Sequence, residues 1–162
     1  MTAASIRSYL QQRVQEYYLD VLPSRWRALL SRLAHHTQRW QQEEQDVNPN
    51  RNLLADIYAD FDLSSALLDE EHQVYREGIS LLRSSLSSFQ NDQLCEATVA
   101  AKHLLQGILS CIALKETIIT HWKNTFVNIP PDTLRVYCHV CIAHPHISTN
   151  EVRRVCALYA SR

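Results

Sequence analysis

The sequence predicts an all-α protein. Only two of its 162 residues are glycine, which leaves little of the turn chemistry that tight hairpins require. No sustained apolar/polar alternation indicates strands, whereas apolar residues recur at helical spacings of three and four along most of the chain. With 46% hydrophobic and 20% charged residues, the chain is too apolar for a disordered or linker-rich protein. We therefore expect a single bundle of six or seven helices over residues 1–162, either a small whole protein or a domain of a longer one.

The first half of the chain predicts four helices. The first helix is expected to end at Pro23, because proline lacks the amide donor and clashes with the preceding turn. Ser24 can cap the second helix, which runs to the Asn-Pro-Asn break at 48–50. A short helix over 52–61 follows. Asp62 or Ser64 can then cap a longer helix that runs to Phe89. The face predicted to be buried in the first helix consists of Ile6, Leu10, Val14, Tyr17 and Val21.

The second half predicts one long helix and a C-terminal helical hairpin. The segment 92–126 is apolar around most of its circumference between Leu104 and Ile119, which is typical of a central helix sheathed by its neighbours. Prolines 130 and 131 end this helix. The helices 133–143 and 149–160 are then expected to pack as a hairpin.

The start of the last helix has the clearest local signal. Ser148 and Glu151 have the spacing of a capping box, in which the serine hydroxyl accepts a hydrogen bond from the first helical turn. Ile147 and Val152 stand where a hydrophobic staple would form. We therefore expect a helix beginning at residue 149.

Charge is segregated along the chain although the net charge is only −1. Residues 1–40 carry six arginines against two acids, and residues 41–77 carry ten acids against two arginines. Such blocks serve either internal pairing within a bundle or a charged partner. Internal pairing is the favoured interpretation, and a partner surface is the alternative.

The predicted interaction surface lies on the second helix. Arg25, Arg32 and Arg39 repeat every seven residues on one helical face, and Trp40 follows them in a polar stretch. Tryptophan and arginine are enriched at interface hot spots. We expect a non-catalytic interaction module, an adaptor or scaffold subunit, whose partner is another protein or a second copy. An apolar groove for a partner helix is the other way in which such a module could bind. The acidic side chains that would instead pair with these arginines are Asp56, Asp60, Asp69, Glu70 and Glu71.

Nucleic-acid binding is the first alternative function. The same arginine stripe could contact phosphates, and Arg153 and Arg154 lie early in a helix that would follow a helix-turn-helix-like turn. This alternative is weaker because the chain is not basic and the turn is long and contains Pro145.

A zinc-stabilised domain is the second alternative. Cys138, Cys141, His144 and His146 lie within nine residues and include the Cys-x-x-Cys spacing of zinc sites. Structural zinc sites join two separated ligand pairs, however, and here the second pair is absent. Buried core cysteines are therefore the favoured interpretation, and no metal site is assigned.

No motif indicates an enzyme. Phosphate-binding glycine loops, a Gly-x-Ser-x-Gly elbow and Glu-x-x-His pairs are all missing from the sequence, so we expect neither catalysis nor a cofactor. No N-terminal stretch has the pattern of a leader peptide, so we do not expect one, and the most apolar window, 104–114, is about half as long as a bilayer span. The five cysteines do not suggest a disulfide framework. We expect a cytoplasmic or nuclear protein that does not bind membranes.

Overall fold

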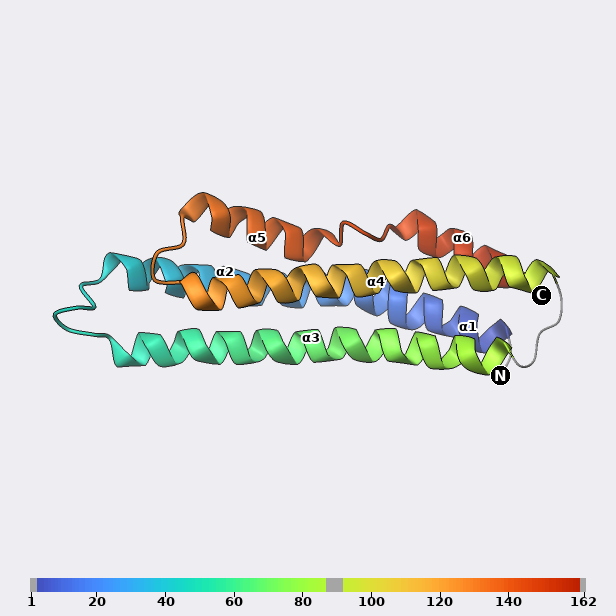
Figure 1. Ribbon diagram of the computed structural model, residues 1–162, viewed down its shortest axis with the longest axis horizontal. Coiled ribbons are helices and arrows are strands. Elements are labelled where there is room, and N and C mark those ends of the chain that lie inside the picture. The colour runs from blue at the N-terminus through green and yellow to red at the C-terminus, as the bar shows by residue number, and fades with distance from the viewer. Residues whose placement is uncertain (1–2, 87–91, 161–162) are drawn as a thin grey trace.

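The computed structural model, which describes residues 3–86 and 92–160, is an elongated antiparallel bundle of helices (Figure 1). The all-α prediction is confirmed: the described residues contain no strand and form five continuous helical segments, so the expected six or seven was too many. The elements are α1 (Ala3–Tyr9), the π-helical η1 (Leu10–Val21), α2 (Leu22–Gln42), α3 (Arg51–Leu86), α4 (Asp92–Thr125), α5 (Pro131–Ala143) and α6 (Thr149–Ala160).

Four rods make up the bundle. The N-terminal rod comprises α1, η1 and α2 without interruption, α3 and α4 form the second and third rods, and α5 and α6 lie end to end as the fourth (Figure 1). Each rod contacts its two neighbours in a closed ring, and α4 contacts α3, α5 and α6. The prediction that α4 is central was therefore wrong, because among the described residues its backbone makes no close contact with the diagonal N-terminal rod. The two meet through core side chains instead: Trp122 Nε1 donates to Thr37 Oγ1 at 3.0 Å.

Pro23 does not end the first helix. It lies at the start of α2, directly after the π-helical turns of η1, and the chain stays helical from residue 3 to residue 42. Proline has no amide hydrogen to donate and crowds the carbonyl four residues earlier. The backbone hydrogen bonds change here from the i→i−5 pattern of a π-helix to the i→i−4 pattern of an α-helix. Leu22 N–H still bonds Tyr17 O, five residues earlier. The proline is thus accommodated where the hydrogen-bond register already shifts.

The π-helix also changes which residues of the first rod face the core. Tyr17 is half-buried and Val21 is exposed, whereas Tyr18 and Leu22 are fully buried. A constant spacing of four suits the wider π turn better than the 3.6 residues of an α turn. The buried residues that keep this spacing are Ile6, Leu10, Val14, Tyr18, Leu22, Trp26 and Leu30.

Helix α3 is one continuous helix, so the predicted division near residue 62 was wrong. Ser64 does not cap a new helix; its hydroxyl donates to the carbonyl of Asp60, one turn earlier, at 2.9 Å. No proline or glycine interrupts the backbone there, and tertiary packing on both sides favours continuity. The predicted end at Phe89 lies outside the described residues.

The C-terminal helices do not form the predicted hairpin. Helix α5 packs on α2 and α4, α6 packs on α1, η1 and α4, and the two make no mutual contact among the described residues. The helix-turn-helix geometry is therefore absent. At the end of α5, His144 adopts a left-handed conformation with φ of 47°, and the chain continues in the same overall direction (Figure 1). The start of α6 is confirmed, since Glu151 N–H donates to Ser148 Oγ at 3.1 Å.

The apolar part of helix α4 is longer than the predicted window 104–114. Within the described residues, Glu96–Thr125 is the one stretch that length and composition would allow to cross a membrane, and it contains an 18-residue window with a mean hydropathy of 1.4. A core helix of a helical bundle meets the same criterion. Here the buried side chains of α4 pack against its neighbours in the bundle.

Candidate interaction site

The three predicted arginines are each paired with an acid and each about half exposed. Arg25 Nη1 lies 2.5 Å from Glu70 Oε2, and Arg32 Nε lies 2.7 Å from Asp60 Oδ1. Arg39 pairs with Glu43, the residue that directly follows α2, at 3.1 Å. The carboxyl of Asp60 is buried and also bonds His36 Nδ1 at 2.7 Å. The stripe therefore has a structural role, and its exposed edges remain accessible.

Pairing between rods explains much of the segregated charge of the sequence. The basic N-terminal rod lies beside the acidic α3, and Arg13 forms two hydrogen bonds with Glu77 at 2.9 and 3.2 Å. These bonds raise the pKa of Arg13. Burial opposes ionisation of Glu70, but hydrogen bonds from Tyr17 and Arg25 outweigh it and lower the pKa of that carboxyl. The two charge blocks thus help to join the first two rods.

Arg25 and Arg32 border an apolar groove between α2 and α3, which we call the α2–α3 groove. Leu29 and Leu67 form a buried floor, and Leu63 is 49% exposed at the rim. Small exposed alanines on both helices leave the space between them open, with a volume of about 270 Å³. The lining residues are Arg25, Ala28, Leu29, Arg32, Leu63, Ala66 and Leu67.

Trp40 lies outside this groove, at the end of the bundle where the 43–50 loop connects α2 to α3. Its half-buried ring packs edge-on against Phe126, with centroids 5.8 Å apart. Together with Val47 and Val127 it lines a separate hollow of about 300 Å³, which we call the loop-end hollow. The structure therefore divides the predicted surface in two: Arg25 and Arg32 on the groove, and Arg39 and Trp40 near the loop end.

A buried polar centre, which was not predicted from the sequence, joins three of the rods. Lys115 Nζ lies 2.9 Å from Glu71 Oε1, and both side chains are shielded from solvent. Trp26 Nε1 donates to the other oxygen of Glu71 at 2.8 Å. The ammonium of Lys115 also lies 5.4 Å from the ring centroids of both Tyr18 and Trp26, within cation–π range. The sequence contains one indication of this centre: Glu71 occupies a position in the helical repeat of α3 that faces the core.

His144 lies against this centre from the fourth rod. Its ring is edge-on to Tyr18 at a centroid distance of 4.7 Å, and it is 3% exposed. Neither ring nitrogen, nor the Tyr18 hydroxyl, has a hydrogen-bond partner among the described residues. Burial, and next the charge of Lys115, lower the pKa of His144 to about 3. Burial likewise raises the pKa of Tyr18. The centre thus holds His144 neutral.

The four candidate zinc ligands do not come together. Cys141 and His144 are buried, Cys138 is half-buried and His146 is exposed. In the described part of the chain, no three His, Cys, Asp or Glu side chains lie where they could hold one metal ion. Burial raises the pKa of the Cys141 thiol to about 12, which disfavours the thiolate that zinc requires.

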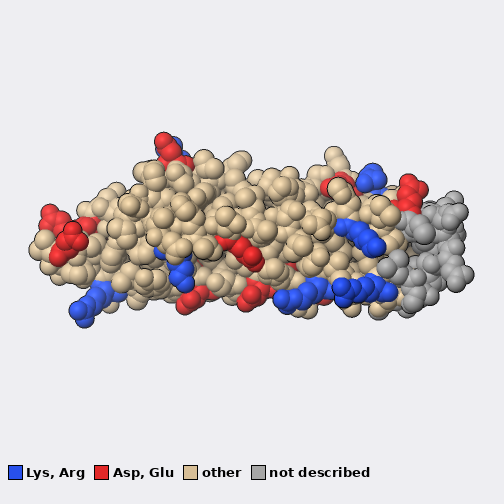
Figure 2. Space-filling view, viewed as in Figure 1, with Lys and Arg blue, Asp and Glu red and all other residues tan. Residues whose placement is uncertain are grey.

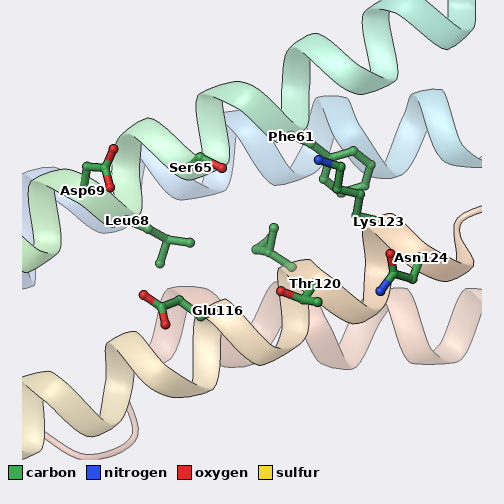
Figure 3. Close-up of a pocket in the computed structure, with 9 residues that line it drawn as sticks. Phe61, Ser65, Leu68, Asp69, Glu116, Thr120, Lys123 and Asn124 are labelled. Atoms are coloured by element: carbon green, nitrogen blue, oxygen red, sulfur yellow. The ribbon is translucent and has the colours of Figure 1, made fainter.

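A third hollow lies between α3 and α4, with a volume of about 480 Å³ (Figure 3). Asp69 and Glu116 face each other across one end, and Lys123 and Asn124 lie at the other. Glu116 is already bonded to His72 Nε2 at 2.5 Å. Ser65 also lines the hollow, but among the described residues no hydrogen bond connects its hydroxyl to a basic group. The arrangement therefore provides no activated nucleophile.

Comparisons with protein families, characterised proteins and solved structures find no match for this chain.

Proposed function

We propose that the protein is a non-catalytic interaction module whose α2–α3 groove binds an amphipathic helix with acidic side chains. The observation that carries this proposal is the groove itself, an apolar trough between two arginines with the exposed Leu63 at its rim. Helix-in-groove recognition requires such an apolar floor for the anchors of the partner and polar groups that set its register.

Charge complementarity supports an acidic partner. Arg32 engages Asp60 through Nε alone, and a guanidinium has five N–H donors, so donors remain for a second carboxylate. Arg25 and Arg32 are two helical turns apart, a rise of about 10.5 Å. Carboxylates at positions i and i+7 of a partner helix match this spacing, while leucines between them would contact Leu63 and the groove floor.

Side-chain bonds between α2 and α3 also hold the groove in a fixed shape, as a rigid base. Its two helices are held together by Arg25–Glu70 and Arg32–Asp60 at the groove and by Trp26–Glu71 beneath it. A preformed site loses less conformational entropy on binding than a flexible one. Truncating either arginine would disturb this base, so Leu63 is the better position for a test.

The test compares two helical peptides that differ only in charge. Both have a leucine stripe, and one carries Glu and the other Lys at positions i and i+7. We expect the acidic peptide to bind more tightly in a fluorescence-anisotropy titration, and Leu63→Glu to weaken its binding by about tenfold or more. The matched control is Val99→Glu, which changes a 66% exposed valine on α4 and should leave binding unchanged.

Equal binding of both peptides, or equal loss in both variants, would contradict the proposed groove. A short DNA or RNA duplex serves as the competing probe. Phosphate contacts predict oligonucleotide affinity that falls steeply with salt, whereas an apolar groove predicts weak dependence. Oligonucleotide binding without peptide binding would therefore favour the nucleic-acid alternative over the interaction module.

A further inference from the structure

The loop-end hollow combines exposed apolar side chains with unbalanced negative charge. Val47 is 82% exposed and Val127 is 62% exposed, and Trp40 lies beside them. The lining includes three carboxylates and no lysine or arginine. Figure 2 shows acidic side chains gathered at this end of the molecule. The lining residues are Trp40, Gln41, Glu43, Glu44, Gln45, Asp46, Val47 and Val127.

Hydrogen bonds hold the hollow in shape. The Gln41 side-chain amide donates to the carbonyls of both Phe126 and Ile129 at 2.9 Å, which ties α2 to the segment after α4. Within the 43–50 loop, Asn50 N–H donates to the Gln45 side-chain oxygen at 2.8 Å. Two loops that are distant in sequence are thus fixed against each other, and the hollow is largely formed before any partner arrives.

The carboxylates of the hollow are only partly neutralised within the chain. Glu43 accepts hydrogen bonds from Asn50, Arg39 and Gln45, and the first of these contributes most to lowering its pKa. Glu44 and Asp46 are exposed, and no ion pair with either is present among the described residues. Two acidic groups therefore flank an apolar patch that contains a tryptophan, a residue type enriched at interface hot spots.

We propose that the loop-end hollow is a second docking site, for a protein segment with an apolar anchor flanked by lysine or arginine. The anchor contacts Trp40, Val47 and Val127, and the basic side chains pair with Glu44 and Asp46. Complementary charge at such a rim favours association and excludes partners of the wrong sign. Trp40 lies about 12 Å along α2 from Arg32, so this site and the groove accept opposite charges at separate places. A protein with both sites would connect an acidic partner to a basic one.

Trp40 provides a direct reporter for this site. The other two tryptophans, Trp26 and Trp122, are fully buried, so acrylamide should quench mainly the fluorescence of Trp40. The probe is a short peptide with leucine anchors flanked by lysines, and its control has glutamate in place of lysine. We expect the basic peptide to reduce the quenching constant by about twofold, and the acidic peptide to leave it unchanged. Trp40→Phe, which should remove most of the quenching, verifies the reporter.

Charge reversal distinguishes this site from the rest of the surface. Glu44→Lys combined with Asp46→Lys should weaken binding of the basic peptide by about tenfold, whereas Glu16→Lys combined with Asp20→Lys, at exposed acids of η1, should not. Leu63→Glu should also leave this binding unchanged, which separates the result from the fate of the groove. Equal protection by both peptides, no protection by the basic one, or equal loss in both reversed variants would overturn the proposal.

Discussion

Replacing Lys115 with methionine tests the energetics of the buried polar centre. Methionine retains most of the length and apolar volume of the lysine stem but removes the ammonium. In the folded protein that ammonium lies 2.9 Å from Glu71 Oε1, and the two side chains are 1% and 0% exposed. Lys115→Met therefore leaves a carboxylate that is shielded from solvent and retains one hydrogen bond, from Trp26 Nε1.

The expected loss of stability follows from the cost of an unpaired buried charge. Removing one partner of a buried ion pair typically destabilises a protein by about 3–5 kcal/mol. With a urea m-value of about 2 kcal/mol/M, this corresponds to a fall of about 2 M in the unfolding midpoint. Combining Lys115→Met with Glu71→Gln removes both charges and retains an oxygen that can accept from Trp26. The double variant should recover about 2 kcal/mol or more of the loss.

Urea unfolding followed by far-UV circular dichroism measures both variants against the original protein. The contrast between the single and double variants is the informative quantity, because loss of packing volume at Lys115 affects both equally. A single-variant loss of about 1 kcal/mol or less, or a double variant less stable than the single one, would refute the conclusion that the pair is desolvated and mutually neutralising.

Two further predictions concern the same level of the bundle. The pKa of His144 is about 3 in the folded protein, against an ordinary value of 6.5. As the pH falls below 6.5, the unfolded chain therefore takes up a proton at this residue that the folded protein does not bind. The free energy of unfolding should be unaffected by this residue above pH 6.5 and should fall by about 2 kcal/mol by pH 5. Asparagine tolerates the left-handed backbone of residue 144, so His144→Asn should remove only the pH dependence that the histidine causes. The measurement is the urea midpoint of both proteins between pH 7 and pH 5. An identical pH slope in the two proteins would contradict the low pKa of His144. Gly107→Ala would place a Cβ 2.6 Å from the carbonyl oxygen of His146, so it should destabilise the protein by about 1–3 kcal/mol although alanine favours helices; a rise in thermal midpoint would show that the contact relaxes freely.

Local signals in the sequence were sufficient for the fold class and for several helix ends. The Ser148 hydroxyl caps the last helix, which is the serine half of the predicted capping box, and the Asn-Pro-Asn segment and the paired prolines do separate helices. These features depend on residues within one turn of each other, so no tertiary information is needed to interpret them. The wrong predictions concern helix ends at which a residue that often ends or begins a helix is instead held inside a continuous helix by tertiary packing. Pro23 is accommodated at the end of a π-helix, and Ser64 bonds back to its own helix.

The arrangement of the last two helices depended on tertiary contacts. A short connection between amphipathic helices usually indicates a hairpin. Here the apolar faces of α5 and α6 find different neighbours along the bundle, so the short connection joins two helices end to end. No residue within the connection predicts that the two helices lie end to end. The left-handed conformation of His144 is particularly unexpected, since glycine or asparagine usually occupies that position.

The candidate site was predicted in part. Spacing correctly placed Arg25 and Arg32 on one face of α2, and both lie on the groove. Asp60 and Glu70 were among the acids named as possible partners of these arginines, and both form the ion pairs; spacing could not show which acid lies opposite which arginine. Trp40 was grouped with the arginines because it follows them in sequence, yet it lies at the end of the bundle. The Glu71–Lys115 pair joins residues 44 positions apart, a separation that helical periodicity does not address.

Mapping the bound acidic peptide onto the protein tests the proposed function most directly. Backbone amide chemical shifts of the isotope-labelled protein would be followed as the leucine–glutamate peptide is added. We predict that the largest changes fall on residues 25–32 and 63–67, the two sides of the α2–α3 groove, and that Leu63→Glu raises the peptide concentration needed to produce them by about tenfold or more. Changes confined to α5 and α6, or none at a peptide concentration that saturates binding, would contradict the assignment of the groove as the interaction site.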